Sequence, residues 1–152
     1  MKLSLATMAM LSVCSIALAA ESKLCAKEDL IGQWESVAVK VNPAYEGNAG
    51  ADYYPYQRYA FDAPGKMKVL TSTKPFDVAS DVMWNNFPNS TSYTVDKRGV
   101  IAQSGPELPR TQYEACDIII SGDQKVNAGD MILTSFTANG APYGQKVFKK
   151  KT

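Results

Sequence analysis

The types and the spacing of the chemistry-bearing residues in this chain restrict the reactions that it could catalyse. Among its 152 residues there are three cysteines and no histidine. The lack of histidine excludes Ser-His-Asp and Cys-His catalysis and histidine-ligated zinc. The acidic residues show no spacing typical of a general acid–base pair; the ones considered are Asp77, Asp81, Asp117 and Asp123. We therefore expect a protein that is not an enzyme and that uses no metal or cofactor.

Tyrosines are concentrated in and just after residues 42–55, a segment rich in Gly, Asn and Pro that is typical of a long loop. Their rings are large and amphipathic, which suits an apolar ligand that carries a polar group. Five of them are expected to contact such a ligand: Tyr45, Tyr53, Tyr54, Tyr56 and Tyr59. Trp84 would close the same opening from a helix-like segment. The alternative is that the tyrosines only pack the loop and a strand end, and that Trp84 belongs to an element covering one end of the fold.

The first twenty residues have the pattern of a secretory signal peptide. Lys2 is followed by an uncharged, mostly apolar segment, and Ala17-Leu18-Ala19 forms an A-x-A cleavage pattern. We expect residues 1–20 to be removed and residues 21–152 to form one domain, exported to a bacterial periplasm or secreted. The alternative is a loose lipobox at residues 11–14, which would make Cys14 a lipid-modified N-terminus.

Removal of this segment changes the charge and cysteine counts. It takes away one of 16 basic residues and none of the 15 acidic residues, so the net charge falls from +1 to zero. A neutral chain gives no reason to expect nucleic acid as a partner, and no later segment has the roughly 20 apolar residues of a membrane span. Cys25 and Cys116 remain, and in an oxidising compartment we expect them to form a disulfide. We expect a monomer.

The region after the signal peptide is predicted to consist of strands separated by tight turns. Eight segments have strand-like patterns: 34–41, 56–61, 67–71, 92–95, 100–103, 113–121, 131–137 and 143–149. Pro64-Gly65, Asp96–Gly99 and Asn139-Gly140 are hairpin signals. Residues 75–88, which are bracketed by prolines, are predicted to form a short helix. We therefore predict an all-β fold, an eight-stranded antiparallel up-and-down barrel with one short helix.

The start of the first strand carries a family resemblance. Gly32-Gln33-Trp34 resembles the Gly-x-Trp opening of the lipocalins and their bacterial lipocalin-like relatives. The resemblance implies that Gly32 and Trp34 are structural, with Trp34 plugging the closed end of the barrel after a short helical turn at residues 25–30. In that family an arginine from the last strand covers the tryptophan. This sequence has no arginine there, and only Lys149 or Lys150 could take its place. The loop at 42–55 would then extend over the barrel mouth.

Three functional classes remain, and we favour the first. A binding protein would hold a small hydrophobic ligand inside the barrel, lined by one face of the strands: Val37, Val39, Tyr59, Phe61, Val69, Ile118, Ile120 and Leu133. Alternatively, a filled barrel would act through its surface as an interaction protein or a protease-inhibitor-like protein, with residues 21–29 as the interacting segment. An enzyme relying on Tyr, Asp, Lys or Arg is the third class. An apolar cavity reachable from the long loop would support the first.

Overall fold

The computed structural model describes residues 20–44, 54–137 and 139–152. Its elements in chain order are β1 (Glu21–Leu24), α1 (Lys27–Leu30), β2 (Gly32–Val41), β3 (Tyr56–Phe61), β4 (Lys66–Ser72), α2 (Val78–Asn86), β5 (Thr91–Val95), β6 (Val100–Ser104), β7 (Gln112–Ser121), β8 (Met131–Phe136) and β9 (Pro142–Lys151). The predicted signal peptide, the alternative lipid-modified Cys14, and the predicted ligand contacts Tyr45 and Tyr53 lie outside the described residues.

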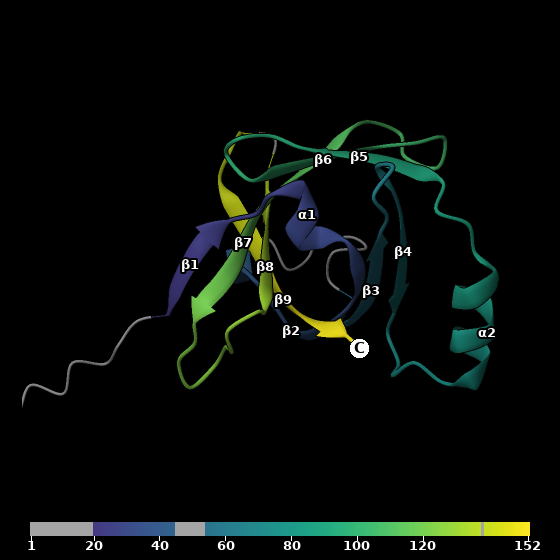
Figure 1. The fold of residues 1–152 in the computed structure, drawn as a ribbon, viewed down its shortest axis with the longest axis horizontal. Coiled ribbons are helices and arrows are strands. Elements are labelled where there is room, and N and C mark those ends of the chain that lie inside the picture. The colour runs from purple at the N-terminus through teal and green to yellow at the C-terminus, as the bar shows by residue number, and fades with distance from the viewer. Residues whose placement is uncertain (1–19, 45–53, 138) are drawn as a thin grey trace, which may run out of the picture.

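Strands β2 to β9 form a closed antiparallel barrel (Figure 1). Each strand pairs with the next one along the chain, and β9 closes the ring by pairing with β2. In an open sheet the two edge strands have unpaired backbone groups that can pair with other chains. Closure of the barrel leaves few such groups unpaired. The prediction of an eight-stranded antiparallel up-and-down barrel is confirmed, although the structure has two short helices where the sequence pattern predicts one.

A ninth strand, β1, is added to the barrel and is missing from the sequence-based prediction. It pairs with the end of β7, where Leu24 lies opposite Asp117. All four residues of β1 are exposed, so the segment lacks the alternation by which a half-buried strand is recognised. The predicted disulfide between Cys25 and Cys116 is present, with Cα atoms 5.4 Å apart. Residues 21–29 therefore do not project as a free interacting arm.

The hairpins predicted at residues 62–66 and 96–99 are both present. In the second, Gly99 has a φ of 70°, a conformation that glycine adopts without the steric cost of a side chain. The side chain of Asp96 accepts a hydrogen bond from the backbone N–H of Val100 (3.0 Å). Turn chemistry therefore fixes where the strands reverse.

Replacement of Gly99 by alanine is expected to lower the free energy of unfolding by about 2–3 kcal/mol, because positive-φ strain and steric overlap combine. A Cβ at this position would lie 2.8 Å from the carbonyl oxygen of Cys116 and 3.2 Å from the backbone nitrogen of Cys25. Urea unfolding measures the loss. Gly140→Ala is the matched control, since φ is 83° there but no described atom lies within 4 Å. Equal losses in the two variants would contradict the steric contribution.

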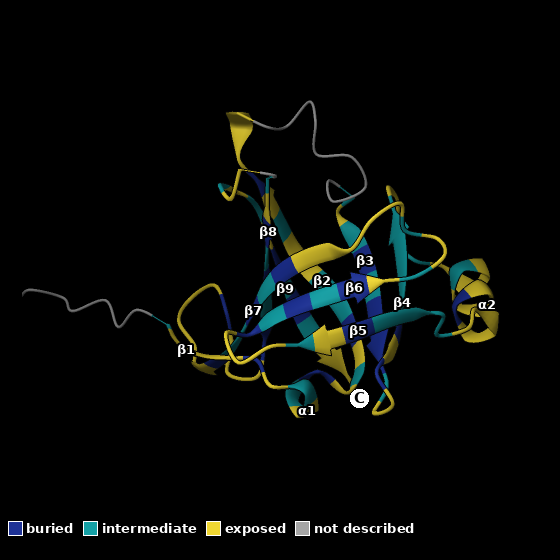
Figure 2. Cartoon of the chain, turned by 90° about the horizontal axis from the view of Figure 1, so that it is seen from above, coloured by how far each residue is buried: buried dark blue, intermediate teal, exposed yellow. Residues whose placement is uncertain are grey.

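Helix α2 confirms the predicted helical segment and lies outside the barrel, beside β3 and β4 (Figures 1 and 2). Its N-cap is Asp77, whose side chain accepts a hydrogen bond from the helix backbone, and the helix ends before Pro88. Lys68 of β4 donates to the carbonyl of Trp84 (2.5 Å). The indole N–H of Trp84 donates to Gln33 of β2 (3.2 Å). These bonds attach the helix to the side wall.

One end of the barrel is closed by α1 and Trp34. The Trp34 side chain is buried, and its indole N–H donates to the carbonyl of Leu30 (2.7 Å). The ammonium of Lys150 lies 5.2 Å from the centre of the Trp34 ring, so the expected cover by a basic residue of the last strand is confirmed for Lys150. Gly32 adopts a φ of 126°, and a Cβ there would lie 2.9 Å from Cε of Lys150. Gly32 thus leaves room for the lysine that covers the tryptophan.

Candidate functional site at the barrel mouth

The half of the barrel nearest α1 is filled by apolar side chains. Six of them are 0% exposed: Leu30, Met67, Ile101, Met131, Leu133 and Phe148. All six belong to one contacting cluster. A side chain with no exposed surface borders no space as large as a water molecule, as expected for a close-packed interior. Around these residues there is therefore no apolar cavity of the kind expected deep in the barrel, and a ligand site must lie elsewhere.

A layer of polar side chains crosses the interior between this core and the open end of the barrel, which we call the mouth. Its centre is Glu114 of β7, whose Oε1 accepts hydrogen bonds from Lys146 and from Ser135 (3.0 Å). Gln103 donates to the other carboxylate oxygen, Oε2 (2.8 Å). Lys146 also donates to the hydroxyl of Tyr59 (3.3 Å). The layer therefore joins β3, β6, β7, β8 and β9.

The charges in this layer are compensated. The side chains of Lys146 and Glu114 are only 2% and 7% exposed, and burying such a pair costs free energy unless further hydrogen bonds support it. Within the described residues, no buried side-chain nitrogen or oxygen lacks a hydrogen-bond partner. Glu114 Oε2 keeps acceptor capacity, because each carboxylate oxygen has about two acceptor positions and Gln103 is the partner that the described chain supplies to it.

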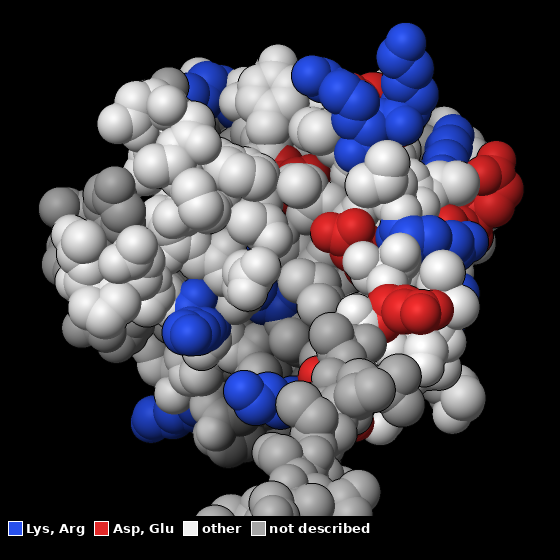
Figure 3. Space-filling model, turned by 90° about the vertical axis from the view of Figure 1, so that its left-hand side faces the viewer, with Lys and Arg blue, Asp and Glu red and all other residues white. Residues whose placement is uncertain are grey.

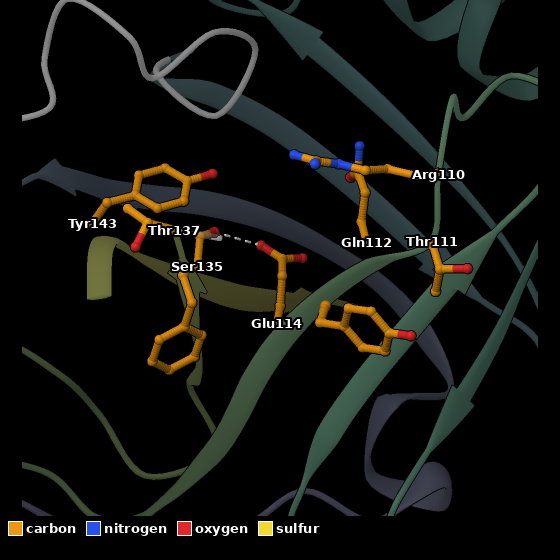
Figure 4. A pocket seen from close by; sticks show the side chains of 9 residues that line it. Arg110, Thr111, Gln112, Glu114, Ser135, Thr137 and Tyr143 are labelled. Carbon is orange, nitrogen blue, oxygen red and sulfur yellow. Dashed lines mark hydrogen bonds between the residues drawn. The ribbon is translucent and has the colours of Figure 1, made fainter. Parts of the chain in front are cut away.

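A recess of about 420 Å³ lies at the mouth and reaches down to this layer. Its walls come from the start of β7 and the loop before it, from the end of β8, and from the start of β9. Figure 4 shows Glu114 and Ser135 at its base, while Arg110 and Tyr143 extend toward each other from opposite sides. Sites for small molecules typically measure about 300–1,000 Å³. The recess is therefore large enough for a small ligand.

Six of the predicted lining residues do face the barrel interior. Tyr59, Phe61 and Leu133 are buried and belong to the packed apolar core. Of the three, Tyr59 also reaches the polar layer, through its hydroxyl. Val39 lies opposite Lys146 and so shares its inward face. Val69, which pairs with Tyr59, packs against the apolar core, and so does Ile118.

The predicted interior position is wrong for Val37 and Ile120, which are 53% and 55% exposed. The pairing of β2 with β9 shifts between Ser36 and Ala38, so Val37 is an extra residue in a β-bulge and the alternation changes face there. Strand β7 pairs with β8 only as far as Ile118, and Ile120 therefore lies beyond the end of the barrel wall.

The predicted aromatic contacts are mostly displaced from the recess. Tyr54 is half-buried beside the start of β3, and its carbonyl accepts a hydrogen bond from Gln57 (2.9 Å). Tyr56 lies on the outer wall, where its ring is 6.4 Å from that of Phe76. The expected closure of the mouth by Trp84 is wrong, because α2 packs on the side wall of the barrel. The alternative position at a barrel end is wrong for the same reason.

Sequence analysis missed Glu114, Lys146 and Gln103 as residues of the site. The sequence did contain a pattern that places two of them in the interior: Glu114 precedes Cys116 by two positions, and Lys146 precedes Phe148 by two positions. Strand alternation places residues two apart on the same face. Charged residues are almost never fully buried unless they are paired, and the pairing became visible only when β7 and β9 were placed in the barrel.

Charged side chains of both signs occur on the outer surface. On the face shown in Figure 3, acidic and basic side chains lie close together at the upper right, and further basic side chains lie apart from them at the lower left. On the wall beside α2, Arg58 pairs with Glu35 (2.8 Å) and with Asp81 (2.6 Å). Burial by itself would lower the pKa of Arg58, but its hydrogen bonds to Asp81 and Glu35 raise the pKa above its usual value. None of the helices described is long and apolar enough to cross a membrane.

The structure thus defines a small closed β-barrel with one plugged end and a polar recess at the other. Among the residues it describes, no group of three or more Cys, Asp or Glu side chains is placed to hold a metal ion. Comparison with protein-family models, with curated proteins and with solved structures finds no match to this chain. The barrel and its mouth are therefore the features that bear on function.

Proposed function

We propose that this protein is an exported, non-enzymatic, lipocalin-like binding protein that holds a small amphipathic molecule at the barrel mouth. The observation that carries the proposal is the recess of about 420 Å³ whose base is the hydrogen-bonded carboxylate of Glu114. Few, well-oriented polar groups in a concave site give a ligand its orientation, and aromatic surface adds affinity. Here Tyr143 and Phe136 supply the aromatic surface.

Two features of the closed end support this class of protein. Trp34 plugs the barrel under Lys150, the arrangement that the resemblance to lipocalins implies. The disulfide between Cys25 and Cys116 suits an oxidising compartment such as the periplasm. Because the interior next to the plug is filled, the ligand is assigned to the mouth rather than to the depth of the barrel.

A second candidate, an interaction protein, is favoured by helix α2. Four of its apolar side chains, including the residue that ends the helix, point into solvent: Val78, Val82, Met83 and Phe87. Exposed apolar groups that lie together are typical of surfaces that bind other proteins. A filled barrel would suit this role equally well, so the two candidates need a direct test.

Native mass spectrometry of protein purified from its own cell envelope is that test. We expect a species whose mass exceeds that of the mature chain by the mass of one small molecule, and that loses it on denaturation. Retention of a protein partner instead would favour the second candidate. A bare chain in both the native and the denatured spectrum would contradict the binding proposal.

Tyr143→Ala is expected to weaken binding at the mouth by about tenfold, because a buried aromatic contact is worth roughly 1.5–3 kcal/mol and the ring is only partly covered. The measurement is the fluorescence titration of 8-anilinonaphthalene-1-sulfonate, an aromatic anion. Phe87→Ala is the matched control, since it removes an exposed ring at the end of α2, which packs on the side wall and not at the mouth. A loss of binding in Phe87→Ala, with Tyr143→Ala unaffected, would count against the mouth and for the helix.

A further inference from the structure

The arginine beside the mouth recess has no counter-charge within the described chain. Arg110 borders the recess, and Figure 4 shows its side chain reaching over it. For the described residues, the structure gives its guanidinium neither an ion pair nor a hydrogen bond. The other two arginines of the sequence are each paired with a carboxylate: Arg58 with Glu35 and Asp81, and Arg98 with Asp96. Arg110 differs from them in facing a recess instead of a carboxylate.

A second basic residue, Lys40, lies near the same rim, but it follows the inward-facing Val39, so its side chain lies on the outer face of the wall. A neighbouring recess of about 430 Å³ shares Tyr143 with the first and is bordered by Lys40. Among the described residues that border the two recesses, the one carboxylate is that of Glu114, and it is paired with Lys146. Among the described residues, Arg110 is therefore the charged group of the mouth recess that has no counter-charge, and it gives the recess a net positive charge. The planar guanidinium of arginine matches a carboxylate through two parallel hydrogen bonds.

We infer that the mouth site selects a small organic carboxylate that also carries an amide or hydroxyl donor. The ligand carboxylate pairs with Arg110, and the donor gives its hydrogen bond to Oε2 of Glu114, which retains acceptor capacity. Lys146 already neutralises Glu114, so the donor is a neutral group rather than an ammonium. This ligand class rests on the proposed function, because it presumes that a small molecule binds at the mouth.

Calorimetric titration of the whole protein with three matched compounds tests the inference. N-acetylphenylalanine carries both the carboxylate and the amide N–H. Its methyl ester lacks the negative charge, and 3-phenylpropanoate lacks the amide. We expect the ester to bind at least about tenfold more weakly than the acid, because charge-assisted hydrogen bonds are lost. We expect 3-phenylpropanoate to bind about fivefold more weakly, because one hydrogen bond to Glu114 is lost.

Arg110→Gln is expected to remove the preference for the acid over the ester, because the affinity for the acid falls much more than the affinity for the ester. Arg98→Gln is the matched control, because Arg98 lies in the β5–β6 turn next to the plugged end, and it should keep the preference. Equal binding of acid and ester would overturn the inference, and so would a preference for the acid that persists in Arg110→Gln. Neither result would contradict the proposed function, which the Tyr143→Ala variant tests separately. Failure of all three compounds to bind would also overturn it, and native mass spectrometry would then decide the proposed function separately.

Discussion

Removal of the disulfide, by Cys25→Ser together with Cys116→Ser, is expected to lower the free energy of unfolding by about 4–5 kcal/mol. The bridge joins residues 91 positions apart, and a cross-link that closes so long a loop strongly restricts the unfolded chain. It also anchors β1 and α1, since the backbone N–H of Cys25 donates to the carbonyl of Cys116 (3.1 Å). Urea unfolding, followed by tryptophan fluorescence, measures the loss.

The wild-type protein reduced with dithiothreitol is the matched control for this double variant. Both should unfold at the same urea concentration, because both lack the same bond. A loss below about 1 kcal/mol would contradict the prediction. So small a loss would mean that the pairing of β1 with β7 is enough to keep the N-terminal segment in place when the disulfide is absent.

Lys146→Met is expected to lower the free energy of unfolding by about 3–5 kcal/mol, because it leaves the carboxylate of Glu114 buried without its counter-charge. Both side chains are almost fully buried, so solvent compensates only a small part of the lost charge. Adding Glu114→Gln should recover at least half of the loss. The glutamine side chain is neutral, and its oxygen can still accept a hydrogen bond from Ser135 or Gln103. Urea unfolding of both single variants and of the double variant gives the coupling between the two sites.

An exposed ion pair provides the comparison. Lys23 and Asp29 lie 2.7 Å apart, with side chains 49% and 22% exposed. Lys23→Met should cost less than about 1 kcal/mol, because water and salt screen such pairs. The prediction would be wrong if Lys146→Met lowered the free energy of unfolding no more than Lys23→Met does. It would also be wrong if the variant that carries both Lys146→Met and Glu114→Gln were as unstable as Lys146→Met alone.

Much of the barrel was predictable because its signals are local. Turn residues such as Gly99 mark the points where strands reverse, and alternation marks the strands between them. Prolines 75 and 88 bracket α2. The segment that escaped prediction, β1, is four exposed residues long. Its extended conformation depends on pairing with an edge of β7 that is distant in the sequence, so no local sequence pattern predicts this strand.

The site was less predictable, since it depends on which strands meet. Tyr59 was identified from the sequence, and it does reach the polar layer. Glu114 and Lys146 were not identified, because each by itself looks like an ordinary surface charge. Their burial is possible only because barrel closure brings β7 and β9 to either side of β8. The bulge at Val37 likewise follows from pairing with β9 and not from the alternation of β2 alone.

By itself, then, the sequence determined the fold class, the hairpins, the cysteine pair, the plug at Trp34 and the exclusion of histidine chemistry, because composition, turn residues and alternation act over a few residues. Only the tertiary structure decided that the core beside the plug is filled, that α2 covers the side wall, and that a buried ion pair forms the base of the mouth. These features depend on strand register and on barrel closure, and closure sets the depth at which each inward side chain lies.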